Sequence, residues 1–71
     1  MALFGRRQPA ASLDTIRHLQ REAGAYRSLA DTRARDAREA PTATGRARLK
    51  EGAKDARRRA REFEREARRL G

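Results

Sequence analysis

The feature that most constrains this sequence is an apolar repeat in its C-terminal part. Seven apolar positions alternate between spacings of four and three residues, and they are Leu49, Ala53, Ala56, Ala60, Phe63, Ala67 and Leu70. A helix with this heptad repeat presents a continuous apolar seam, which leaves water only by packing against another helix. The repeat therefore predicts a helix over residues 45–70, which Gly71 ends.

A second helix is predicted upstream, over residues 12–40. Ser12 is a suitable N-cap, and Asp14 lies where a negative charge favours the start of a helix. Pro41 disfavours helical geometry at the residue before it, so this helix should end near Glu39. The seam of this helix consists of Ile16, Leu19, Ala23, Tyr26, Ala30, Ala37 and Ala40, with Arg33 on the same line.

The loop 41–45 connects the two predicted helices, and either Thr42 or Thr44 can cap the second one. A connection this short makes the helices antiparallel neighbours. The two seams then match in layers, most of which place a large side chain against alanine, so the helices can approach closely without voids. The predicted pairs are Ala37 with Leu49, Arg33 with Ala53, Ala30 with Ala56, Tyr26 with Ala60, Ala23 with Phe63, Leu19 with Ala67 and Ile16 with Leu70.

We therefore expect an all-α fold: an antiparallel two-helix hairpin that resembles a coiled coil and has an alanine-rich seam. A single long helix and a bundle formed between chains are the alternatives. With 71 residues the chain is one domain at most, and much of its apolar content is alanine. We expect a marginally stable monomer that gains stability as a homo-oligomer or as a subunit of a complex. Residues 1–11 are expected to form a flexible tail.

The sequence contains no phosphate loop, zinc-ligand spacing or nucleophile motif. It has no cysteine and one histidine, which excludes thiolate and histidine metal clusters. That residue, His18, is spaced from Asp14 and Glu22 as in exposed helix-surface pairs, and two packed helices leave no room for a catalytic cleft. We expect no enzymatic activity, cofactor, metal or small-molecule substrate. No apolar run suits a membrane span or a signal peptide, so we expect a cytoplasmic location or one inside an assembled particle.

Positive charge is the strongest compositional signal, with a net charge of +9. Residues 45–70 contain eleven basic and five acidic residues, whereas residues 12–40 contain six and five. Most of the excess therefore belongs to the second helix, where a basic stripe is predicted on the face opposite the alanine seam. The basic stripe consists of Lys54, Arg58, Arg61, Arg65 and Arg68, and Arg57, Arg59 and Arg69 flank it.

This stripe predicts a non-enzymatic protein that binds nucleic-acid phosphates without sequence preference. The planar fork of arginine can donate two hydrogen bonds to phosphate oxygens at once, and a rigid helix face can follow a phosphate backbone. The predicted contact residues are Lys54, Arg57, Arg58, Arg61, Arg65, Arg68 and Arg69. Few aromatic residues are available for stacking on bases, because Tyr26 and Phe63 belong to the seams.

Two other interpretations stay open at this point. The first is that the basic stripe is a solvated helix face, since acidic residues alternate with its arginines. The second is a structural or adaptor subunit, either of a phage or plasmid-encoded assembly or as the partner of an acidic protein. For that role the candidate contacts are the apolar and basic tail residues Leu3, Phe4, Arg6 and Arg7, and two leucines that lie off the main seam, Leu13 and Leu29.

Overall fold

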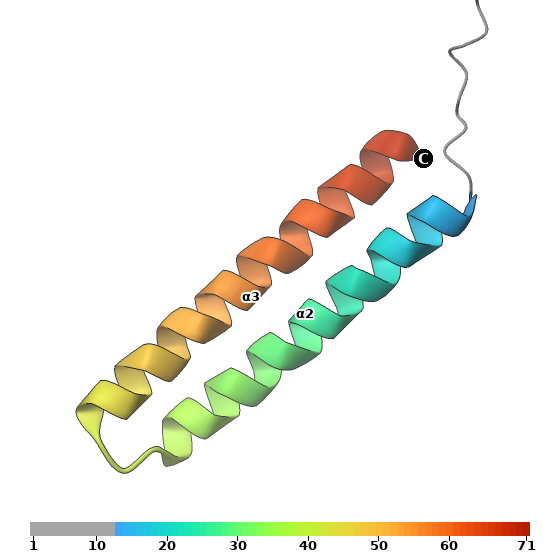
Figure 1. Cartoon of the computed structure of the whole chain (residues 1–71). Coiled ribbons are helices and arrows are strands. Elements are labelled where there is room, and N and C mark those ends of the chain that lie inside the picture. The colour runs from blue at the N-terminus through green and yellow to red at the C-terminus, as the bar shows by residue number, and fades with distance from the viewer. Residues whose placement is uncertain (1–12) are drawn as a thin grey trace, which may run out of the picture.

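The computed structural model describes residues 13–71, which form two antiparallel helices joined by a short loop (Figure 1). Helix α2 spans Leu13–Glu39 and helix α3 spans Ala43–Leu70. The helices lie side by side along their length, so the predicted all-α hairpin is confirmed. The predicted tail 1–11 and the predicted N-cap Ser12 lie outside the described residues.

The loop is held by specific hydrogen bonds at the two helix ends. Helix α2 stops before Pro41, as the clash between proline and the preceding backbone requires. Thr42 caps α3, since its hydroxyl oxygen accepts a hydrogen bond from the backbone N–H of Gly45 at 3.0 Å. Helix α3 therefore begins two residues earlier than the predicted position 45. Arg46 also donates from Nη1 to the carbonyl oxygen of Ala40 at 3.0 Å, which ties α3 back to the end of α2.

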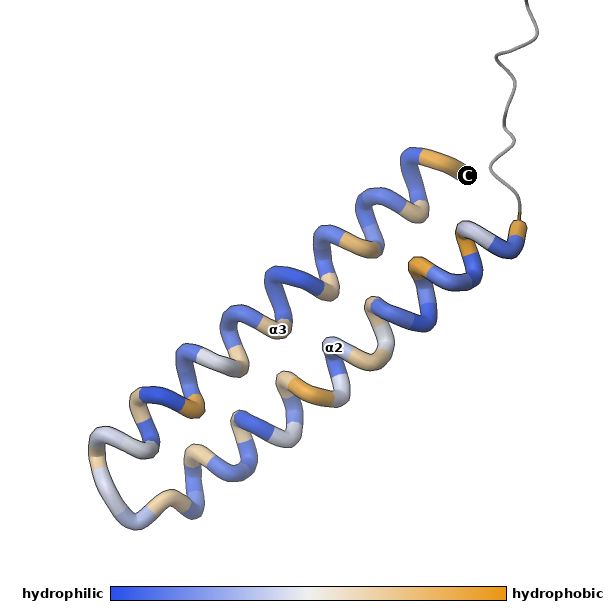
Figure 2. The backbone as a smooth tube through the Cα atoms, viewed as in Figure 1, coloured by the Kyte–Doolittle hydropathy of each residue, from blue (hydrophilic) through white to orange (hydrophobic). Residues whose placement is uncertain are grey.

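The core of the hairpin consists of alanine. Figure 2 shows apolar segments recurring along the facing edges of the two helices, between long hydrophilic stretches. Among the described residues, no large side chain is fully buried and no polar or charged residue is buried. Alanine side chains allow the two backbones to approach closely, so the interface is thin and its contacts are mostly between small groups. The buried residues are Ala23, Ala30, Ala37, Ala53, Ala56, Ala60 and Ala67, each at most 5% exposed.

We name the two seam positions of each helix a and d. The remaining heptad letters then say on which side of the interface each side chain lies. Every buried alanine except Ala56 is at position a, together with the half-buried Ile16. Position d holds most of the large seam residues. These d residues are Leu19, Tyr26, Arg33 and Ala40 in α2, and Leu49, Ala56, Phe63 and Leu70 in α3.

The predicted layers are close to the observed ones near Arg33, which donates from Nη1 to the carbonyl oxygen of Gly52 at 3.2 Å, one residue from its predicted partner. The prediction was wrong to give both aromatic residues only alanine neighbours. The rings of Tyr26 and Phe63 stack on each other, with centroids 5.7 Å apart and planes 16° from parallel. Helical side chains lean toward the N-terminus of their own helix, so in an antiparallel pair these two rings lean toward one another.

The alanine core makes the hairpin sensitive to added volume. Ala60 is 2% exposed, so Ala60→Leu places three extra carbon atoms where the helices are in contact. We expect a loss of about 1–3 kcal/mol in the free energy of unfolding, the usual cost of overpacking. The control Arg61→Leu changes the adjacent, exposed residue and should melt close to the parent. Circular dichroism melts measure both, and an Ala60→Leu variant that melts at or above the parent temperature would contradict this packing.

The N-cap of α3 provides a second test of the fold. Thr42→Ala removes the hydroxyl oxygen that accepts from Gly45, which should lower the free energy of unfolding by about 0.5–2 kcal/mol. Thr44→Ala is the matched control, because Thr44 is exposed and lies inside the first turn of α3. Urea titrations should separate the two variants. Equal midpoints would show that the observed cap contributes nothing.

Candidate functional site: a basic groove between the helices

A shallow groove runs along one side of the helix pair. It extends from the end near Ile16 and Gly71 to the loop end near Arg38 and Lys50. It is continuous, because its end segment and its middle segment share Arg27 and Glu64, and its middle and loop-end segments share Arg57. We call it the basic groove. Its floor is Ile16, Ala23, Ala30, Ala37, Ala53, Ala60 and Ala67, and its walls are Gln20, Arg27, Asp31, Ala34 and Arg38 of α2 with Lys50, Lys54, Arg57, Arg61, Glu64 and Arg68 of α3.

The heptad pattern explains why the groove lies on this side. In an antiparallel pair, positions b and e of both helices lie on one side of the seam, and positions c and g lie on the other. Every wall residue is at b or e, and every floor residue is at a. Alanine at position a leaves the floor low, while larger d residues such as Tyr26 and Phe63 fill the opposite side of the interface.

Charge is divided between the two sides of the hairpin. The groove walls carry seven basic residues and two acidic residues, Asp31 and Glu64. Positions c and g on the opposite side carry three basic and six acidic residues. The basic excess is therefore concentrated on the groove side instead of being spread around the helices. The opposite side holds Arg48, Arg59 and Arg69 together with Glu22, Asp36, Glu39, Asp55, Glu62 and Glu66.

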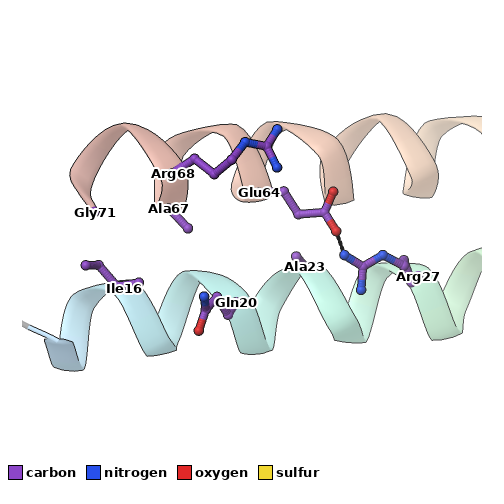
Figure 3. Close-up of a pocket in the computed structure, with 8 residues that line it drawn as sticks. All are labelled: Ile16, Gln20, Ala23, Arg27, Glu64, Ala67, Arg68 and Gly71. Carbon is purple, nitrogen blue, oxygen red and sulfur yellow. Dashed lines mark ion pairs between the residues drawn. The ribbon is translucent and has the colours of Figure 1, made fainter.

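One ion pair crosses the basic groove. The Arg27 guanidinium of α2 contacts the Glu64 carboxylate of α3, with 57% of the arginine side chain and 27% of the glutamate side chain exposed (Figure 3). In the same view Arg68 extends along α3 toward Glu64, and Ile16 and Ala67 project into the space between the helices. Within residues 13–71, the ion pairs of the structure use no groove cation other than Arg27. Arg57, Arg61 and Arg68 therefore present their charge to whatever enters the groove.

The predicted contact residues divide into two groups in the structure. Lys54, Arg57, Arg61 and Arg68 line the basic groove. The others do not line it: Arg58 pairs with Asp55 and Arg69 with Glu66 within α3, and Arg65 lies with Arg68 beside a shallow depression on α3 alone. The prediction placed the whole basic stripe opposite the alanine seam, and this is wrong for its members at position b. Spacings of four and three alternate between positions b and f, and only f points away from the partner helix.

The sequence prediction missed three cations of the groove: Arg27 and Arg38 of α2, and Lys50 of α3. The sequence does contain a pattern that identifies these three cations, because all of them occupy heptad positions b or e. It becomes visible only when the two helices are considered as a pair, since the same side of an antiparallel hairpin collects b and e from both. The pattern of α3 alone indicates the stripe but not the wall that faces it.

The predicted protein-contact residues are not brought together. Leu13 and Leu29 are exposed, by 66% and 36%, but Leu13 is at position e on the groove side and Leu29 is at position g on the opposite side. They also lie about 24 Å apart along α2 at 1.5 Å per residue. Leu3, Phe4, Arg6 and Arg7 fall outside the described residues. The two leucines therefore belong to two different surfaces.

No group of histidine, cysteine and carboxylate side chains that suits a metal ion occurs in the part of the chain that the structure describes. Neither α2 nor α3 has an apolar stretch of the length that a bilayer requires. Comparison of the chain with protein-family models, with curated proteins and with solved structures gives no match. The geometry and charge of the basic groove are therefore the basis for any assignment.

Proposed function

We propose that this protein is a non-enzymatic binder of nucleic acid, which holds the phosphate backbone against the walls of the basic groove. The observation that carries this proposal is the segregation of charge, with seven basic and two acidic residues along the groove. A solvated helix face has no reason to collect one sign of charge from two helices on a single side. A polyanion gains from such an arrangement, because each neutralised phosphate releases condensed counterions.

The dimensions of the groove suit an extended ligand. Its α3 wall runs from Lys50 to Arg68, about 27 Å at 1.5 Å per residue, and its cations recur on nearly every turn. That length lets one phosphate strand lie along the wall and meet several cations in succession. The cations of the α3 wall are all exposed, so their side chains can adjust to phosphate positions.

The groove favours backbone contacts over base recognition. Neither Tyr26 nor Phe63 lines it, because their rings stack on each other elsewhere in the interface. Stacking on single-stranded bases needs such rings in the binding surface, and base-edge recognition needs side chains fixed in a nucleic-acid groove. We therefore expect affinity that depends strongly on salt and little on sequence.

A second candidate is an adaptor that binds an acidic, amphipathic helix of another protein in the same groove. The observation that favours it is the floor of the groove, which is alanine apart from Ile16 and accepts apolar side chains between the helices. Acidic residues of such a helix would pair with the walls. Nucleic acid is the first candidate, because the apolar floor offers little contact area whereas the walls carry seven basic residues.

Removing two groove cations should weaken nucleic-acid binding more than removing two cations elsewhere on α3. In Arg57→Gln/Arg61→Gln both substituted residues line the groove, whereas in the control Arg58→Gln/Arg69→Gln both already pair with acids of their own helix. Both variants have the same reduction in net charge. In fluorescence anisotropy with a labelled duplex, the slope of log affinity against log salt should fall by about 1 for each phosphate contact that the substitution removes, in the groove variant only.

The outcome of this comparison decides between the groove and a general charge effect. Equal reductions in affinity for the two double variants would mean that only net charge matters. No binding of the parent protein at low salt and micromolar concentration would remove the nucleic-acid proposal, and the acidic-helix candidate would then stand alone.

The ion pair across the groove gives a prediction of opposite sign. Glu64→Gln removes an acidic wall residue and releases Arg27, so affinity for a duplex should rise and the salt slope should steepen by about 1. Glu62→Gln is the control, because Glu62 is an exposed residue at position c, off the groove. The free energy of unfolding should change by less than about 1 kcal/mol, as for other partly exposed ion pairs. A decrease in affinity would show that Glu64 organises the site instead of competing with the ligand.

A further inference from the structure

The side of the hairpin opposite the basic groove carries most of its large apolar residues. Six of them are at positions d or g, and none is buried. They are Leu19, Tyr26, Leu29, Leu49, Phe63 and Leu70, and we call this surface the second face. Five charged residues at d or g lie among them: Glu22, Arg33 and Asp36 of α2, and Arg59 and Glu66 of α3. The second face is therefore apolar at its centre and mixed in charge.

A single hairpin cannot bury these side chains. Two helices share one line of contact, and in this chain alanine occupies most of the buried positions on that line. The Tyr26–Phe63 stack consequently lies at the surface of the pair, and Leu29 is 36% exposed beside it. Large apolar groups that stay partly exposed along one side of a small helical protein mark a place where another helix can pack.

We propose that the second face binds a second copy of this chain through a twofold axis, with each helix antiparallel to its own counterpart. A face that pairs with itself must bring complementary residues together around its axis, twice over. On α2 one register does this for the four residues nearest the axis, while the next layer places Leu19 opposite Asp36 of the second copy. When Tyr26 lies opposite Leu29 of the second copy, the spacing along the helix also places Glu22 opposite Arg33 of the second copy. Two apolar contacts and two ion pairs then form around the axis.

The charges on α3 select the same axis. In the second copy, α3 can lie antiparallel to its counterpart with Arg59 opposite Glu66. The centre of that arrangement lies between residues 62 and 63. The α2 register has its centre at residues 27 and 28. These two centres are at one level of the hairpin, because Tyr26 stacks on Phe63 and Arg27 pairs with Glu64. One twofold axis therefore brings opposite charges together on both helices.

Two of the side chains that would form these ion pairs still have hydrogen-bond donors or acceptors available for a further partner. Arg33 uses Nη1 for the carbonyl oxygen of Gly52 and keeps its other N–H donors. Glu66 already accepts from Arg69 of its own helix, and a carboxylate accepts several hydrogen bonds. The charges at position c lie at the rim of the second face, where they stay in water. A pair formed in this way turns both basic grooves outward, on opposite faces of the dimer.

The test measures the mass of the full chain in solution, without nucleic acid, by sedimentation equilibrium across a wide range of protein concentrations. The parent should be a dimer that dissociates on dilution. Leu29→Lys should shift dissociation to at least tenfold higher concentration, because it places a charge opposite Tyr26 of the second copy. Leu13→Lys is the matched control, since Leu13 is the more exposed leucine but lies on the groove side, and it should behave as the parent.

A charge exchange tests the register. Arg59→Glu and Glu66→Arg should each weaken the dimer, and the double variant should restore it, with circular dichroism showing that all three remain helical. A parent that is monomeric at every concentration overturns the proposal. So does a dimer that Leu29→Lys leaves unchanged and that groove substitutions such as Arg57→Glu abolish, because association would then use the groove. These outcomes concern the second face only, so duplex binding by the groove variants is judged separately.

Discussion

The contact between alanines at position a of the two helices is the interaction on which the rest of this structure depends. Alanine has no side-chain rotamers to lose and little volume, so two long helices can pack closely with few large residues. The cost is a thin interface whose buried residues contribute little apolar area each. A chain that is rich in charged residues can fold in this way, because the seam needs only one small residue per turn.

The difference in size between positions a and d then gives the hairpin two unlike sides. Small residues at a leave a groove with charged walls on one side. On the other side, Tyr26, Phe63 and the leucines at d cover the interface and remain partly exposed. Charge follows the same division, with an excess of basic residues at b and e and an excess of acidic residues at c and g. A single periodicity in the sequence thus determines shape, apolar exposure and electrostatic character together.

The sequence was sufficient to predict the two helices, their antiparallel pairing and the alanine seam, because each depends on spacings along one helix or on a short loop. It did not reveal the Tyr26–Phe63 stack, which depends on the lean of side chains within the assembled pair. Nor did it reveal the groove walls, since Arg38 and Lys50 become neighbours only after the helices pair in three dimensions. The choice of Thr42 over Thr44 as cap was also open, because both residues have suitable side chains and the loop geometry decides between them.

The concentration of cations in the basic groove has a consequence for the free protein. Like charges on facing walls repel one another, and this repulsion acts against the close approach that the alanine seam requires. The acidic residues of the opposite side are too far around the helices to relieve it. Within the groove, among the described residues, Asp31 and the Arg27–Glu64 pair offset it locally. If the groove binds a polyanion as proposed, the ligand would remove this repulsion and would bind the folded hairpin in preference to the unfolded chain, so binding and folding would stabilise each other. In that proposal, the cations that repel one another in the free hairpin are the same groups that would hold the polyanion.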